Sequence, residues 1–370
     1  MNNPFRNNQL WHLFRAHLME ILREPGVLFW GIIFPILMSL GLGVAFTSKK
    51  DVTHDLAIVG AVPPALDSLL KEHADTNARD PGSDYLVVMQ NPKIGNTTFR
   101  FHKMNWDESM VRLKRGQLNV IVTDSAGNLR YHFDPLNPDG QLTYMKLSNL
   151  VENHDLLNPA SQESISPLMV EGTRYIDFLI PGLMALGVIT SCMWGISYNI
   201  IERRSKKLLR RMVATPMKKS NLLIAMMTVR VGMNFVESGL LLLFAWLVFG
   251  ITIQGSVPAL FAIFIAGNIA FTGIAIFISS HTSKTEIGNG LINAITMPMM
   301  VLSGIFFSYH NFPAWSLGFI KTLPLTMLAD GIRAIFNEGA GWKEVTVPSL
   351  ILFATGALFF TIGLRIFKWH

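Results

Sequence analysis

Side chains that could do chemistry are scattered along this sequence without the spacing of a catalytic site. The motifs HExxH, GxSxG and GxxxxGK(S/T) do not occur in it, so it gives no sign of zinc-protease, serine-hydrolase or P-loop chemistry. The single cysteine, Cys192, excludes a disulfide framework and a cysteine-based zinc site. We therefore expect no catalytic residue, no metal site and no cofactor bound by this chain.

Two charged residues interrupt a long apolar segment. Arg230 and Glu237 are seven positions apart, which places them on roughly the same face of a helix. A charge inside a bilayer is costly and is a functional candidate by default. Glu237 could pair with Arg230, line a translocation route or bind a cationic substrate, while Arg230 could instead extend to the interface. Asn268 and Asn293 lie in other apolar segments and join Glu237 as the candidate translocation route.

A basic segment at 202–216 is the second candidate for function. Leu208, Leu209, Met212 and Val213 give it an apolar side, and Pro216 would end its helix. Its basic residues could steer it to an acidic rim on a partner protein. The alternative is an ordinary basic loop that contacts lipid phosphate.

The composition indicates a membrane protein. Half of the 370 residues are hydrophobic and 15% are charged, whereas soluble domains have roughly 25% charged residues. The net charge is +6, but residues 47–177 hold 13 basic and 17 acidic residues. The excess positive charge therefore lies among the apolar segments, which argues against a nucleic-acid partner.

The apolar segments predict six transmembrane helices, because a span needs about 20 apolar residues. They cover residues 27–46, 178–201, 222–253, 257–279, 287–307 and 346–364. Lys and Arg gather before the first span and after the second, fourth and sixth, which predicts that both termini are cytoplasmic. Residues 47–177 would then lie outside. The first span could instead be a signal peptide, although its apolar run is long for one.

Residues 8–24 are expected to form an amphipathic helix, because Leu10, Phe14, Leu18 and Ile21 recur at helical spacing. This helix either lies in the cytoplasmic membrane interface or packs on the protein's own cytoplasmic face.

The polar region after the first span is predicted to be an α/β (α+β) extracytoplasmic domain, because strand-like and helical patterns alternate along it. Strands are expected near 56–59, 97–101, 119–123 and 129–133, and helices at 65–73, 106–115 and 143–156. A turn is expected at 125–128, a loop at 75–82 and a linker at 161–167. The predicted divisions are 1–46, with the interfacial helix and first span, 47–175, the domain, and 176–370, with five further spans and the loop 202–220.

Several motifs, taken in order, resemble the ABC-2 type transporter permeases. Residues 209–216 follow the pattern L-x-R-(L/M)-x-A-T-P in the cytoplasmic loop, which ends in Ala214, Thr215 and Pro216. Other matches lie at 177–182, 303–307, 324–326 and 330–334. Ser205 and a basic run stand where that family usually has a second acidic residue and Gly-Thr. The large domain after the first span is similar to the branch that includes drug and antibiotic exporters.

The resemblance implies a permease in the inner (cytoplasmic) membrane that works with separate P-loop ATPase subunits, on which ATP and Mg²⁺ would be bound. It also implies a dimer, with a second copy or a paralogous permease. Gly187, Ser191 and Gly195 form a seam whose spacing allows close helix packing, either at a dimer contact or within the subunit. A periplasmic adaptor is a further candidate partner. The residues implied in ATPase coupling are Glu202, Leu208, Leu209, Arg210, Arg211, Met212, Ala214, Thr215 and Pro216.

Three functional classes compete at this point. The first is the permease of an ABC-2 exporter. The second is a membrane-anchored receptor or assembly protein that acts through its external domain without ATP-driven transport. The third is an intramembrane enzyme, which the lack of a nucleophile–base or metal set disfavours.

Overall fold

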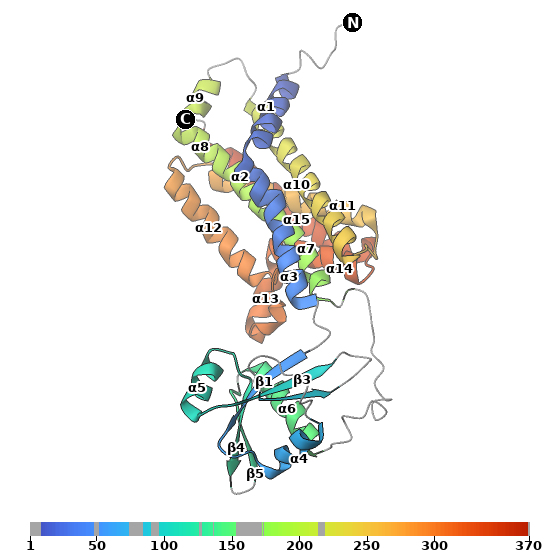
Figure 1. Cartoon of the computed structure of the whole chain (residues 1–370). Helices are drawn as coiled ribbons and strands as arrows, with labels where there is room; N and C mark the ends of the chain where they lie inside the picture. Colours follow the sequence, from blue (N-terminus) through green and yellow to red (C-terminus); the bar gives the residue numbers. More distant parts are fainter. Residues whose placement is uncertain are drawn as a thin grey trace. The chain divides into compact units, whose positions relative to one another are not determined.

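The chain divides into two compact units, which are described separately. A computed structural model assigns one unit to Met1–Thr47 with Val170–His370, and the other to Ser48–Met169. Figure 1 shows a helical unit and a unit built around a sheet. The structure describes residues 9–47, 52–73, 84–89, 96–125, 128–135, 137–152, 172, 174–213 and 219–368.

The inserted unit contains a five-stranded mixed sheet in the order β2-β3-β1-β4-β5. The central strand β1 runs parallel to β3 and β4, while the outer strands β2 and β5 are antiparallel to their neighbours. Its elements are β1 (Val52–Val59), α4 (Pro64–His73), β2 (Tyr85–Met89), β3 (Thr97–Lys103), α5 (Trp106–Lys114), β4 (Val120–Ser125), β5 (Asn128–His132) and α6 (Pro138–Glu152).

Helices cover both faces of this sheet, because side chains of a strand alternate between its faces. Leu56 and Ile58 of β1 pack with buried leucines of α4 and α6, including Leu147. Ala57 faces the other way and packs near α5 with Ile121. The result is a three-layer α/β arrangement.

Three elements of this unit differ from the sequence prediction. Strand β1 begins at Val52 rather than near 56, because the polar residues at 53–55 interrupt the apolar pattern. The short edge strand β2 was not predicted, because its apolar residues do not alternate and a polar stretch precedes them. Helix α6 begins at Pro138 rather than at 143: proline suits the first turn of a helix, and the Asn137 side chain accepts the Asp139 N–H at 3.0 Å. The predicted loop 75–82 and linker 161–167, and the middle of the predicted turn 125–128, lie outside the described residues.

The second unit has helices as the regular secondary structure of its described residues, and non-helical connections such as 250–256 join them. It comprises α1 (Gln9–Arg23), α2 (Pro25–Leu28), the π-helix η2 (Phe29–Ile33), α3 (Phe34–Thr47), α7 (Tyr175–Cys192), the π-helix η5 (Met193–Tyr198), α8 (Asn199–Ser205), α9 (Leu208–Val213), α10 (Lys219–Phe249), α11 (Val257–Ser279), α12 (Thr285–Leu302), the 3-10 helix η6 (Tyr309–Asn311), α13 (Ala314–Thr322), α14 (Pro324–Asn337) and α15 (Trp342–Arg365).

Five helical segments among the described residues are long and apolar enough to cross a membrane. They are Pro25–Phe46, Tyr175–Ser205, Ser220–Phe249, Val257–Ser279 and Trp342–Arg365. Helix α12, at the predicted fifth span, is not among them, because Glu286, Asn289 and Asn293 in its first half lower its hydropathy. Helix α10 ends at Phe249 rather than at 253, because Gly250 adopts a φ of 66° that stops the helix.

The closest helix packing joins α11 and α15 through glycines. A Cβ atom on Gly356 would lie 2.5 Å from the Ile269 carbonyl oxygen, and one on Gly363 would lie 2.9 Å from the Phe277 nitrogen. Small residues let helices approach this closely. The predicted seam on α7 and η5 has another environment: Gly195 faces the Arg230 side chain, and no atom lies within 4 Å of a Cβ built on Gly187.

Helix α1 packs on the protein's own helices. Gln9 accepts a hydrogen bond from Asn221 of α10 at 3.1 Å, and Glu20 pairs with Arg203 of α8 at 2.6 Å. Leu13 packs against the main helical core. Trp11, Met19 and Leu22 are partly exposed, so α1 also presents apolar surface to its surroundings.

Candidate functional site

A groove of about 710 Å³ runs along the helical unit. Its walls come from the α1–α3 segment, the α7–α8 segment, α10 and α12, and its volume is typical of small-molecule sites. Its apolar lining includes Trp30, Phe34, Leu186, Met297 and Met300. Its ionisable lining residues are His17, Glu20, Glu24, Glu202, Arg230 and Glu237.

Two π-helical segments lie on this groove. Trp30 and Gly31 belong to η2, and Trp194, Gly195 and Tyr198 belong to η5. Such wide turns are rare and often occur at functional sites. Periodicity did not reveal them, because a single widened turn leaves the apolar pattern of a span unchanged.

Arg230 and Glu237 lie together on the groove wall. The Arg230 Nη2 is 4.0 Å from the Glu237 Oε1, and the Arg230 Nε donates to the Ser191 carbonyl at 2.9 Å. Both residues are 6% exposed. The Oε1 atom of Glu237 makes no hydrogen bond, so the pairing is a loose one.

Glycines provide room for this pair. A Cβ on Gly31 would lie 2.6 Å from the Glu237 Oε1, and a Cβ on Gly195 would overlap the Arg230 guanidinium. Any larger residue at either position would displace a charged group. No specific sign of this space exists in the sequence, because glycine occurs in membrane spans for many other reasons.

The two asparagines of the predicted route occupy different places. Asn293 lines the groove from α12. Asn268 is fully buried between α10 and α11, where it accepts from Asn234 and donates to the Phe264 carbonyl at 2.9 Å. The structure thus brings Glu237 and Asn293 to one groove, and Asn268 is not among its lining residues.

The residues predicted to couple to an ATPase lie at α8 and α9. Glu202 pairs with Lys206 at 2.8 Å and also lines the groove. Leu208 is 39% exposed, whereas Leu209 is 2% exposed and packs in the chain's own core. Arg210 and Arg211 are exposed. Met212 lies at the end of α9, its side chain is not described, and Ala214, Thr215 and Pro216 lie outside the described residues.

Arg204 anchors α8 to the end of α11, a role the sequence did not indicate. Its guanidinium donates to the carbonyls of Ser279, Ser280, Thr282 and Lys368, and it lies over the Phe367 ring. The Ser279 carbonyl is in the last turn of α11, where a helix leaves its carbonyls without a partner of its own, and the other three lie just beyond helix ends. Arg204 therefore fixes the end of α8, directly before the turn to α9, to the rest of the helical unit.

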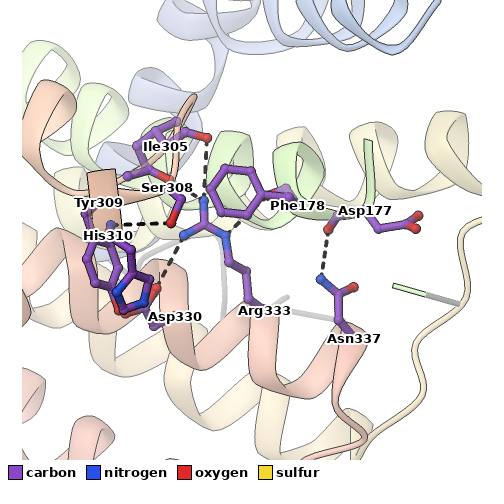
Figure 2. A network of polar contacts seen from close by, with 10 residues as sticks. Asp177, Phe178, Ile305, Ser308, Tyr309, His310, Asp330, Arg333 and Asn337 are labelled. Atoms are coloured by element: carbon purple, nitrogen blue, oxygen red, sulfur yellow. Dashed lines mark hydrogen bonds and ion pairs between the residues drawn. The ribbon is translucent and has the colours of Figure 1, made fainter. Parts of the chain in front are cut away.

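A polar network around Arg333 ties together the other end of the helical unit (Figure 2). Arg333 pairs with Asp330, three residues earlier on the same helix, at 3.3 Å, and its guanidinium lies 3.8 Å from the centre of the Phe178 ring. It also donates to the carbonyls of Gly304 at 2.6 Å and Phe178 at 3.2 Å. One side chain therefore joins α7, α14 and the segment after α12.

Two further hydrogen bonds extend this network. Asn337 donates to the Asp177 carbonyl at 3.1 Å, and Tyr309 donates to Asp330 at 2.8 Å. The full set of partners indicates a structural brace.

The described residues also bear on metal binding. Among them, no group of three or more His, Cys, Asp and Glu side chains is arranged to hold a metal ion.

Comparisons with known proteins agree with the family suggested by the loop motifs. The sequence profile of the ABC-2 type transporter family matches residues 147–337, about half of the chain. The chain is 21% identical over 360 residues to the probable multidrug ABC transporter permease YbhR of Escherichia coli, covering 94% of this chain and 96% of that one. It is 21% identical over 389 residues to the probable multidrug permease YbhS, covering 100% and 98%.

A eukaryotic relative matches over a smaller part of its length. The ABC transporter G family member 20 of Dictyostelium discoideum is 23% identical over 302 residues, which are 73% of this chain and 40% of that protein. The chain thus spans two fifths of that relative. Together with the apolar helices, these matches identify a multi-pass membrane protein with relatives that are transport permeases. The chain belongs to the ABC-2 type transporter family.

Proposed function

We propose that this chain is the permease subunit of an ABC-2 type exporter, which moves a substrate out across the cytoplasmic membrane. The observation that carries the proposal is a groove of small-molecule size with a buried ion pair on its wall, in a chain of this family. Two relatives that align over nearly their whole length are named as probable multidrug permeases, which supports export of small molecules.

The proposed topology has six spans, with α12 as the fifth and both termini in the cytoplasm. The inserted unit then lies outside the inner membrane, where a periplasmic adaptor is a candidate partner. The distribution of Lys and Arg supports this orientation. Helix α1 lies at the cytoplasmic interface and packs on α10 and α8.

The proposed energy source is a separate P-loop ATPase that binds ATP and Mg²⁺, while this chain binds neither. The exposed face of α9, with Leu208, Arg210 and Arg211, is the proposed contact. Because Arg204 fixes the preceding helix to α11, a push on α9 would reach the spans directly. Two copies of this chain, or this chain and a paralogue, would complete the membrane part.

The experiment is co-purification of the full chain with the P-loop ATPase encoded beside it. Leu209 is unsuitable for mutation, because an acidic residue there would disrupt the chain's own core. Leu208→Asp combined with Arg211→Glu changes only exposed positions. We expect wild type to retain the ATPase and this variant to lose it.

Leu142→Asp is the matched control, because Leu142 is an exposed helical leucine of the inserted unit. It is expected to retain the ATPase. Failure of the wild-type chain, intact in membranes, to bind the ATPase would overturn this pairing and favour a receptor or assembly protein. Retention by the Leu208→Asp/Arg211→Glu variant would place the contact elsewhere.

A further inference from the structure

We propose that the groove binds a monovalent organic cation with an apolar body, and that Glu237 receives its charged head. This inference rests on the proposed permease function and names the class of substrate. It starts from the charges on the groove wall, where four carboxylates stand against one guanidinium, with His17 counted as neutral.

Much of that charge is already balanced within the chain. Arg203 pairs with Glu20 at 2.6 Å, and Lys206 pairs with Glu202 at 2.8 Å. Glu24 and Glu237 remain as carboxylates of the lining, and Glu237 is the one held among the spans.

Glu237 has the environment of a carboxylate prepared for another cation. Its side chain is 5% exposed and its Oε1 makes no hydrogen bond, and among the residues that the structure describes its one ion pair is the 4.0 Å contact with Arg230. Arg230 is held away by its bond to the Ser191 carbonyl. A buried charge with so little compensation is costly, so a bound cation would gain from occupying this place.

The rest of the groove suits the body of such an ion. Trp30 and Trp194 present aromatic surfaces, which favour cations, while Phe34, Leu186 and Met297 supply apolar contact. Methionines adapt to ligands of different shape. Gly31 has no side chain, so it leaves space beside the Glu237 carboxylate that a Cβ atom would fill.

The test compares two probe ions of the same shape and opposite charge, tetraphenylphosphonium and tetraphenylborate. Equilibrium dialysis with the full chain in nonionic detergent measures each affinity, and protein-free micelles give the background. We expect the wild-type chain to bind the phosphonium at least tenfold more tightly than the borate. Glu237→Gln should weaken phosphonium binding by about tenfold or more, because the coulombic attraction between the carboxylate and the cation is lost.

Two variants at an exposed groove position provide a second test in case Glu237→Gln does not fold. Asn293→Asp should tighten phosphonium binding several-fold, and Asn293→Lys should weaken it, since they add opposite charges beside the same site. Glu286→Gln, an exposed carboxylate outside the groove lining, should leave the affinity unchanged.

Three results would overturn the proposal: no phosphonium binding by wild type, equal binding of both ions, or unchanged binding by folded Glu237→Gln. If Glu237→Gln does not fold, equal affinities of the two Asn293 variants would overturn it. The dialysis needs no ATPase and the co-purification needs no ligand. Failure of this inference is therefore distinguishable from failure of the permease function.

Discussion

Arg333 is a single residue on which three backbone segments depend. Its guanidinium serves carbonyls of α7 and of the segment after α12, and it pairs with Asp330 on its own helix. The side chain is 9% exposed, so water cannot replace these partners if it is removed. The account therefore assigns it to stability rather than to transport.

We predict that Arg333→Ala lowers the free energy of unfolding by about 3 kcal/mol, because buried carbonyls and the Asp330 carboxylate lose their partner. The thermal unfolding midpoint of the detergent-solubilised chain measures this. Arg112→Ala is the control, since Arg112 forms an exposed ion pair with Glu108 and should matter by less than about 1 kcal/mol. Equal midpoints for the two variants would contradict the role of Arg333.

His54 is the residue that should make the inserted unit sensitive to acid. It is 2% exposed and lies 2.8 Å from Thr143. Burial lowers the pKa of His54 below the ordinary histidine value of 6.5, with a smaller contribution from the positive charge of Lys146. The folded unit then binds fewer protons than the unfolded one, so stability is complete above pH 6.5 and falls as the pH drops towards the lowered pKa.

Pulse proteolysis of the full chain at pH 5.5 and pH 7.5 tests this. We expect faster cleavage within the inserted unit at pH 5.5 in wild type, relative to cleavage of the unfolded chain at the same pH. His54→Gln, which cannot titrate, should reduce that difference. An acid effect of the same size in both proteins would show that other groups cause it.

Local spacing predicted only part of this residue-scale picture. The Asp330–Arg333 and Arg230–Glu237 pairs followed from helical periodicity, because both partners lie on one helix. The carbonyls that Arg333 contacts come from segments distant in sequence, so no spacing rule could identify them. Asn268 and Asn293 looked equivalent in sequence, and only tertiary packing separates a buried amide from one on the groove.

At the scale of elements, the α11–α15 contact shows how glycine sets helix distance. We predict that Gly356→Ala destabilises the chain by about 1–3 kcal/mol, because its Cβ would lie 2.5 Å from a backbone carbonyl oxygen that cannot move aside. Gly290→Ala on α12 is the matched control, since no atom lies within 4 Å of the added Cβ. It should be neutral or stabilising by up to about 1 kcal/mol. Yields of folded chain and unfolding midpoints compare the two, and equal behaviour would contradict the packing.

The element-scale predictions succeeded where patterns are long and failed where they are short. The apolar runs are long and almost free of charge, the α1 segment is strongly periodic, and the structure has them as helices. Strand β2 and the widened turns η2 and η5 are too short to leave a periodic signal. The sequence correctly indicated an apolar side on α9. It could not indicate that Leu209 packs in the chain's own core, because the six residues of α9 do not identify the surface that this side contacts.

At the scale of the whole molecule, the family and the membrane character could be recognised from sequence because motifs and composition extend over most of the chain. The number of spans depends on α12, which is short and polar at its start. We predict that α12 nevertheless crosses the membrane. Glu286→Cys should then react with an impermeant maleimide only from the cytoplasm, and Phe307→Cys only from outside.

The native Cys192 is fully buried and gives little background in this labelling. Phe307 is 72% exposed and Glu286 is also exposed, so both sites are accessible in the described structure. Reaction of both cysteines from the same side would mean that α12 does not span, and the proposed topology would be wrong.

The central claim is that ATP binding on a partner changes the shape of the groove. Spin labels at Trp30→Cys on η2 and Met297→Cys on α12 would report the distance across it, since both side chains line the groove and are exposed. The measurement is the distance distribution in reconstituted complexes, diluted with unlabelled chain, with and without ATP trapped on the ATPase. The account predicts that the distribution shifts with ATP and that Leu208→Asp/Arg211→Glu abolishes the shift. An unchanged distribution, while the bound ATPase hydrolyses ATP, would contradict it.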